Sequence, residues 1–102
     1  MNPLQILLLL SAVQPGPAHG YAIAEKLRIQ SSGTFDLPEG TLYPALHRLE
    51  RASLLASRWS EVNGRRRRVY QLTAKGQRAL SDRHDEWLQF ARAVHAVVGG
   101  HA

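Results

Sequence analysis

The chain has 102 residues, which is enough for one domain with a modest core and too few for two. Its 44% apolar and 21% charged residues are typical of an ordinary folded domain, and the absence of cysteine excludes disulfides and thiolate metal sites. A formal charge of +5, with seven arginines between residues 48 and 68, favours an anionic partner such as nucleic acid.

The first predicted helix covers residues 4–13 and is apolar on nearly every side. Pro3 before it suits a first helical turn. The apolar run is too short to span a bilayer and lacks the basic start of a signal peptide, so we expect a cytoplasmic protein with no membrane partner. A helix that is apolar all round must be covered all round. In so small a domain, that cover must come from a second chain or from a long helix elsewhere.

Two further helices follow a break at residues 14–17, Gln-Pro-Gly-Pro. The second covers residues 20–30, with Ile23, Ala24 and Leu27 on one face. The third is predicted to begin near residues 38–40, because Pro44 is tolerated in a first turn and damaging later. Its core stripe is Leu42, Ala45, Leu46 and Leu49, and the side chains that point elsewhere are Tyr43, His47, Arg48 and Arg51.

Residues 54–62 and 66–72 read as two strands joined by Asn63-Gly64, the strongest short hairpin signal. Thr73 suits an N-cap for a fourth helix that runs from Ala74 toward Val98 and ends at Gly99-Gly100. This order predicts a mainly α fold with a small β-hairpin: a winged helix-turn-helix plus a long C-terminal dimerisation helix. The expected parts are the DNA-binding domain (1–73), the dimerisation helix (74–99) and a tail (100–102).

The third helix is the candidate recognition helix. Its exposed edge offers hydroxyl, imidazole and guanidinium groups, which bind base edges and phosphates in a major groove, and its first turn offers free backbone N–H groups. The alternative is an ordinary amphipathic helix with a solvated polar face, but the arginines that follow favour DNA. The candidates are Thr41, Tyr43, His47 and Arg48.

Four consecutive arginines, residues 65–68, follow the predicted turn. Like charges in a row repel, so a solvated hairpin gains nothing from them. Alternation along a strand sends Arg66 and Arg68 to one face and Arg65 and Arg67 to the other, so all four cannot reach the same phosphates. We predict DNA contact by Arg65, Arg66 and Arg67, nearest the turn. The alternative is a charged edge strand that prevents aggregation.

The fourth helix carries a heptad-like seam. One short core cannot use so much apolar surface at its end, which favours a homodimer over packing on the domain's own core. The seam is Gln77, Leu80, His84, Trp87, Ala91, Val94 and Val98. The predicted dimer interface is Leu4, Leu7, Leu8, Leu80, His84, Trp87, Leu88, Ala91, Val94 and Val98.

Trp87 lies in the middle of this seam. In a dimer it either lines an interface pocket for a small, flat aromatic effector or simply fills the interface. The five histidines show no zinc-ligand spacing, and the sequence holds no phosphate loop, nucleophile–base pair or paired catalytic carboxylates. We therefore assign no metal, no cofactor and no enzyme activity.

Three blocks of the sequence resemble PadR-type transcriptional regulators. They are Gly20-Tyr-Ala-Ile23, Gly40-Thr-Leu-Tyr-Pro-Ala-Leu-His-Arg-Leu-Glu50, and the wing from Gly64 through Arg65–Arg68 to Gly76. The resemblance covers roughly residues 3–80, with the C-terminal helix typical of the compact subgroup that has a single dimerisation helix. One departure is Ala52-Ser53-Leu54, where the family usually has a glycine before the strand.

The resemblance implies a homodimeric winged-helix regulator, often a repressor released by small phenolic or drug-like ligands. The motif match adds Tyr21, Gly40 and Pro44 to the candidate DNA-binding residues. Our hypothesis is therefore a ligand-responsive repressor that binds double-stranded DNA as a homodimer on an inverted-repeat operator. Two alternatives stay open: a sequence-independent architectural DNA binder, and a winged-helix protein-interaction module.

Overall fold

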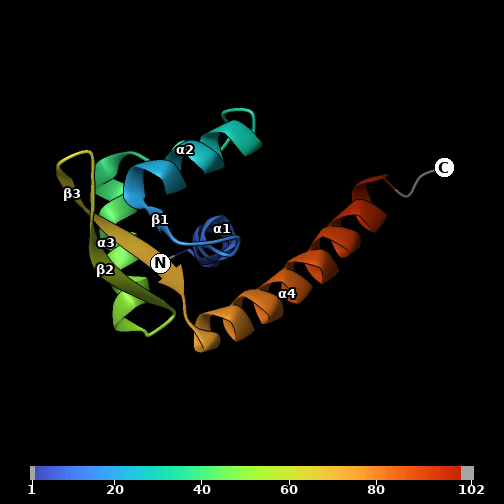
Figure 1. Ribbon diagram of the computed structural model, residues 1–102. Coiled ribbons are helices and arrows are strands. Elements are labelled where there is room, and N and C mark those ends of the chain that lie inside the picture. Colours follow the sequence, from blue (N-terminus) through green and yellow to red (C-terminus); the bar gives the residue numbers. More distant parts are fainter. Residues whose placement is uncertain (1, 100–102) are drawn as a thin grey trace.

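The structure is a computed structural model that describes residues 2–99, the side chain of Val62 excepted (Figure 1). It confirms the predicted winged helix with a long C-terminal helix. The predicted tail, residues 100–102, lies outside the described part. The elements are α1 (Pro3–Val13), β1 (Ala18–His19), α2 (Gly20–Gln30), α3 (Glu39–Arg51), β2 (Leu55–Val62), β3 (Arg65–Leu72) and α4 (Ala74–Gly99).

Helix α1 forms the centre of the core. It lies between α2, the sheet and α4, and is seen almost end-on in Figure 1. Leu9 and Leu10 are fully buried, and each such leucine contributes about 2 kcal/mol. The long helix that the sequence required as cover is the first part of α4, which buries Leu80 in the same core. No helix within residues 2–99 has the length and apolar character needed to cross a membrane.

The sheet has three antiparallel strands in the order β1-β3-β2. Strands β2 and β3 form the wing, with Trp59 opposite Arg68. Asn63 (φ 52°) and Gly64 (φ 76°) both take the left-handed conformation that the predicted turn requires. Strand β1, which the sequence analysis did not predict, pairs His19 with Val69 along the other edge of β3.

Helix α3 begins at Glu39, within the predicted range, but the argument from Pro44 is wrong. Pro44 is the sixth residue of the helix and lies in its second turn. Because proline has no N–H, the carbonyl of Gly40 receives no intrahelical hydrogen bond from it. Both residues are exposed, so water can satisfy that carbonyl, and the helix continues.

Helix α3 ends in a Schellman motif centred on Ser53. The Leu54 N–H donates to the Leu49 carbonyl and the Ser53 N–H to the Glu50 carbonyl, both at 2.9 Å. Ser53 has a φ of 63°, a left-handed conformation that side chains other than glycine adopt at a cost. Ser53 lies within Ala52-Ser53-Leu54, the stretch where the resemblance implies a glycine, and glycine is the residue that takes this φ without strain.

We therefore expect Ser53→Gly to raise the free energy of unfolding by about 1 kcal/mol, because glycine adopts this φ without strain. Urea unfolding followed by circular dichroism measures the change. The matched control is Ser81→Gly, an exposed position inside α4, which should lower stability by about 0.5 kcal/mol. Equal effects of the two substitutions would contradict the explanation from backbone conformation.

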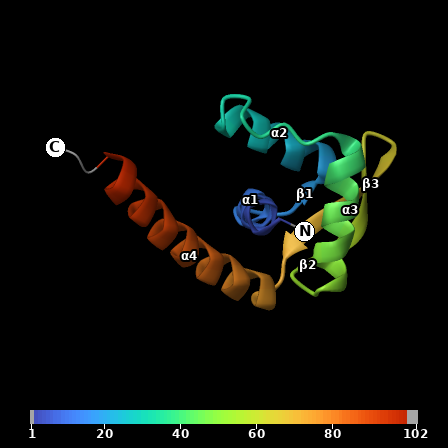
Figure 2. The ribbon, with the colours of Figure 1, turned by 180° about the vertical axis from the view of Figure 1, so that it is seen from behind.

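Helix α4 starts where Thr73 caps it, as predicted: the Gly76 N–H donates to Thr73 Oγ1 at 2.9 Å. The helix then leaves the body of the protein, as both views of the ribbon show (Figures 1 and 2). Its distal half, residues 85–99, carries large apolar side chains in the open. Trp87 is 43% exposed, Phe90 61% and Val98 73%.

Candidate nucleic-acid interface

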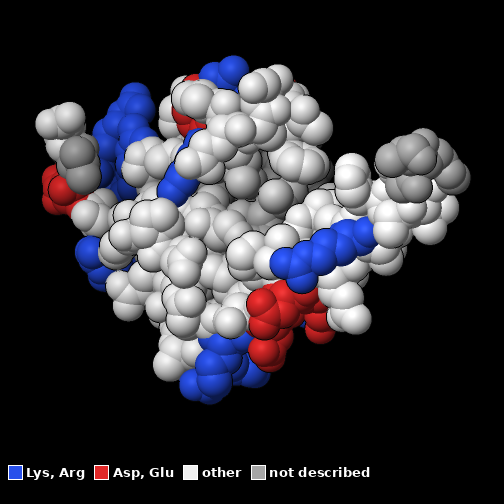
Figure 3. Space-filling view, turned by 90° about the vertical axis from the view of Figure 1, so that its right-hand side faces the viewer, with Lys and Arg blue, Asp and Glu red and all other residues white. Residues whose placement is uncertain are grey.

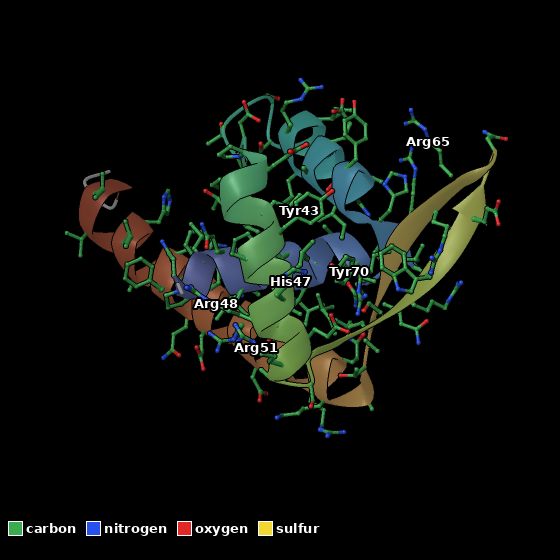
Figure 4. The ribbon with its side chains drawn as sticks, turned by 90° about the vertical axis from the view of Figure 1, so that its left-hand side faces the viewer. Tyr43, His47, Arg48, Arg51, Arg65 and Tyr70 are labelled. Atoms are coloured by element: carbon green, nitrogen blue, oxygen red, sulfur yellow. The ribbon has the colours of Figure 1, made fainter. Side chains whose placement is uncertain are left out.

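A hollow of about 940 Å³ lies between α3 and the wing. Figure 4 shows α3 facing the viewer with the wing projecting beside it and Arg65 near the wing's far end. Helix α3 contributes Tyr43 and His47 to the hollow, and β1 and the start of α2 contribute His19, Gly20 and Tyr21. The wing contributes Trp59, Tyr70 and all four arginines of the run.

The structure brings six of the predicted DNA-binding residues together around this hollow and leaves four outside it. Arg48 lies on the side of α3 away from the wing (Figure 4). A single flat ligand could not touch both sets, whereas a duplex that crosses α3 and the wing could. The residues at the hollow are Tyr21, Tyr43, His47, Arg65, Arg66 and Arg67, and those outside it are Gly40, Thr41, Pro44 and Arg48.

Tyr43 is not a free side chain on the recognition helix. It is half-buried and packs against the core, with its ring over Gly20. A Cβ added at position 20 would lie 2.5 Å from the ring and 2.7 Å from the hydroxyl oxygen. Glycine at position 20 therefore allows the ring and its hydroxyl to lie against the start of α2, beside the hollow.

Arg68 is held by α3. Its Nε donates to Ser57 Oγ at 2.8 Å, and its Nη2 lies 3.5 Å from Glu50 Oε2. Ser57 in turn donates to the same Glu50 oxygen. This Glu50–Ser57–Arg68 contact joins the C-terminal half of α3 to both strands of the wing, so the angle between helix and wing is constrained by polar contacts as well as by the core.

Trp59, for which the sequence suggested no role, is 55% exposed on the wing. Two guanidinium groups lie over its ring: the Cζ of Arg66 is 4.8 Å from the ring centroid and the Cζ of Arg68 is 5.3 Å from it. The predicted two-residue turn at Asn63-Gly64 fixes the strand register and places Trp59 opposite Arg68. The signal for this contact was therefore present in the sequence.

His19 caps α2 and touches the wing. Its Nδ1 accepts a hydrogen bond from the Ala22 N–H at 3.3 Å, so the neutral ring carries its proton on Nε2. The Arg67 Nη1 lies 3.3 Å from that Nε2. Both nitrogens carry protons in this tautomer, so two donors face each other without an acceptor. Burial, and then the positive charge of Arg67, lower the pKa of His19 below its usual value. Protonation would remove the cap and set two positive charges side by side.

The lowered pKa predicts a loss of stability in acid. Stability is fully present above the unfolded-state pKa of about 6.5 and is lost as the pH falls through the lower folded-state value. We expect the urea midpoint to fall between about pH 7.5 and about pH 5, and His19→Asn to reduce that fall, because its side-chain oxygen caps without titrating. His95→Asn, at an exposed position on α4 outside the predicted dimer interface, should leave the fall unchanged. The same pH dependence in all three proteins would contradict this role for His19.

Arg65, Arg66 and Arg67 remain available to an anionic partner. Among the residues that the structure describes, acidic groups pair with Arg28 and Arg68 alone. The two lysines of the sequence take no part in the hollow. Lys26 Nζ donates to the Ala12 carbonyl at the end of α1, and Lys75 Nζ donates to the Ala52 carbonyl at the end of α3, at 3.5 and 2.9 Å.

A second exposed surface lies on the opposite side of the molecule, from which α4 projects. The centre of this side is largely uncharged, and charged side chains lie toward its margins and along α4 (Figure 3). A hollow of about 520 Å³ lies between the N-terminus of α1 and α4, lined by Leu4, Leu7, Trp87 and Phe90 with Arg83 and Glu86 at its edge. Leu7 and Leu80, predicted as interface residues, are already buried in the chain's own core.

Comparison with known proteins places this geometry in a family. The sequence model of the transcriptional regulator PadR-like family matches residues 8–82. The transcriptional regulator Rv3488 of Mycobacterium tuberculosis is 41% identical over 76 residues, which cover 74% of this chain and 68% of that protein.

Solved structures agree with this match. A transcriptional regulator from Clostridium thermocellum superposes with a TM-score of 0.85 at 27% identity, covering 94% of each chain. A PadR family transcriptional regulator from Eggerthella lenta gives a TM-score of 0.80 at 31% identity, covering 92% of this chain and 80% of that one. The winged helix, the basic wing and these matches agree, and the chain belongs to the PadR-like family of DNA-binding transcriptional regulators.

Proposed function

We propose that this regulator is a repressor that binds an inverted-repeat operator as a homodimer and is released by a small aromatic ligand. The observation that carries the proposal is the shared hollow, where Tyr43 and His47 of α3 face the same space as wing arginines that have no acidic partner among the described residues. One helix with base-reading side chains beside a cationic hairpin fits a major groove and the adjacent backbone. One copy covers only half a site, so a two-fold repeat requires a second.

The dimer proposal is supported by the distal half of α4. Trp87, Leu88, Val94 and Val98 are each between 36% and 73% exposed, and the neighbouring surface is largely uncharged (Figure 3). An apolar patch of this kind on a small domain marks an interaction site. We propose that α4 packs against its mate and against the exposed part of α1, through Leu4, Leu8, His84, Ala91 and the four residues named above.

The ligand proposal is supported by the hollow beside Trp87. Its walls are apolar, and Arg83 and Glu86 provide polar groups at the edge, as in sites for flat aromatic molecules. The hollow also adjoins the proposed dimer interface, so a bound ligand could alter the spacing of the two recognition helices. Titration with a panel of aromatic ligands, followed by tryptophan fluorescence with Trp87→Phe as control, tests this step. No change of signal across the panel would contradict it.

DNA binding itself is tested by footprinting on the DNA that flanks the protein's own coding region, followed by affinity measurements on the protected sequence and on a mixed-sequence duplex across a salt series. We expect the protected site to bind about 10³-fold more tightly, or better, at physiological salt. Equal affinity at every salt concentration would favour an architectural DNA binder. No binding to either duplex would favour a protein-interaction module.

Light scattering at micromolar concentration gives the oligomeric state, and a monomeric mass contradicts the dimer.

A further inference from the structure

We infer that Trp59 positions Arg66 for DNA binding, and that Arg68 anchors this pair to α3 instead of contacting DNA. The inference rests on the proposed contact between the wing and the DNA backbone and assigns separate roles within the arginine run. Trp59, Arg66 and Arg68 lie on one face of the wing, with Trp59 directly opposite Arg68 in the strand register. Arg66 is the exposed outer member of the group, and Arg68 is the half-buried inner one.

The two arginines differ in what their guanidinium groups already bind. Arg68 donates to Ser57 and Glu50, so its charge is partly neutralised and its direction is set by α3. Arg66 has no acidic partner among the residues described, and its guanidinium lies over the Trp59 ring, 4.8 Å from Cζ to centroid. Of the two, Arg66 is therefore the group free to ligate a phosphate.

Stacking on an indole ring suits this task. Tryptophan is the best aromatic partner for a cation, and the guanidinium binds the ring through its flat face. The N–H groups of the guanidinium point outward in the guanidinium plane, so they remain free to form paired hydrogen bonds with phosphate oxygens. An arginine held in this way also loses less side-chain freedom on binding DNA than an arginine in solvent.

Trp59 has no other evident reason to occupy this position. It lies outside the core cluster and is 55% exposed, in a wing whose neighbouring side chains are polar or charged. The chain of contacts runs from Glu50 on α3 through Arg68 to the ring and then to Arg66. Through these contacts, the position of the recognition helix influences the direction in which the Arg66 side chain points.

A double-mutant cycle on Trp59→Leu and Arg66→Ala tests the inference, with anisotropy of a labelled mixed-sequence duplex at low salt as the readout. Phosphate contacts are independent of sequence, so this probe needs no known operator. We expect Trp59→Leu to weaken binding by about two- to fivefold for each wing, Trp59→Phe to weaken it less, and Trp59→Leu to add little when Arg66 is already alanine. Unchanged thermal unfolding would show that the variants are folded.

The outcomes separate the inference from the proposal beneath it. If both single substitutions weaken binding and their effects multiply in the double variant, Trp59 does not act through Arg66 and the inference is overturned. If Arg66→Ala changes nothing while the protein still binds the duplex, the proposed wing contact at Arg66 fails, and the inference fails with it. A protein that binds no duplex overturns the proposed DNA-binding function itself.

The anchoring role of Arg68 has its own readout. We expect Arg66→Ala to lower the slope of log affinity against log salt by about 0.9 for each wing, since one phosphate contact is lost. Arg68→Ala should leave that slope nearly unchanged and lower the unfolding temperature instead. An equal loss of slope in the two variants would make Arg68 a phosphate ligand and overturn the division of roles.

Discussion

Gly76→Ala is expected to destabilise the protein by roughly 3–5 kcal/mol, enough to unfold much of a small domain. A Cβ at this position would lie 2.0 Å from the carbonyl oxygen of Leu54. That oxygen accepts a hydrogen bond from the Thr73 N–H at 3.2 Å, whereas the single Thr73 hydroxyl proton has the Ser53 carbonyl at 2.6 Å as its nearer acceptor. Moving the Leu54 carbonyl aside would break its bond to the N–H, at about 1 kcal/mol, and would loosen the start of α4 from the wing.

Urea unfolding measures this effect, and Gly40→Ala is its matched control. Gly40 also lies in the first turn of a helix, but a Cβ there would meet nothing within 4 Å. Alanine at position 40 should therefore stabilise the protein by up to about 1 kcal/mol through helix propensity. If both alanines stabilise the protein, the close approach of α4 to Leu54 cannot be correct.

Val94→Asp is expected to convert the proposed dimer to a monomer and to weaken binding to a two-fold DNA site by about 10²-fold or more. Val94 is 44% exposed on the distal half of α4, so a carboxylate there costs the isolated chain little. In a dimer, each copy would bring an unpaired charge into an apolar contact, which is strongly unfavourable. Each monomer would then bind its half-site alone, without the gain in affinity that comes from joining two DNA-binding domains in one dimer.

Light scattering and anisotropy on the footprinted duplex measure the two effects. The control is Gln89→Asp, which places the same charge on the opposite face of α4 and should change neither the mass nor the affinity. A dimer that survives Val94→Asp would refute the assignment of this face to the interface. A monomeric parent protein that nevertheless protects a two-fold site would refute the dimer itself.

The order of elements could be predicted from the sequence because each is marked by strong local signals. Asn63-Gly64 marks the turn, Thr73 marks the start of α4, and the stripe from Leu42 to Leu49 marks α3, and all three are confirmed. Strand β1 was missed because two residues after a Pro-Gly-Pro break show no periodicity. The start of α3 was predicted correctly, but Pro44 lies in its second turn and not in its first, because an exposed carbonyl tolerates the missing N–H.

The candidate site was predictable only as a set of residue types. The sequence identified the arginine run and the exposed edge of α3, and alternation separated Arg66 and Arg68 from their neighbours. It did not indicate that Glu50 would contact Arg68, 18 positions along the chain, or that two guanidinium groups would lie over the Trp59 ring. The register of the wing follows from its turn, but these contacts also depend on side-chain conformations and on the angle between the wing and α3, which are set by tertiary packing.

The distribution of lysine and arginine has a consequence for control in the cell. Both lysines bind helix-end carbonyls in the body of the protein, so every cation at the hollow between α3 and the wing is an arginine. Arginine keeps its charge at any physiological pH and is not a substrate for acetylation. Neither acidification nor lysine acylation could therefore discharge this surface. In the proposed dimer, a ligand could instead release DNA by changing the spacing of the two recognition helices, which is a mechanical form of control.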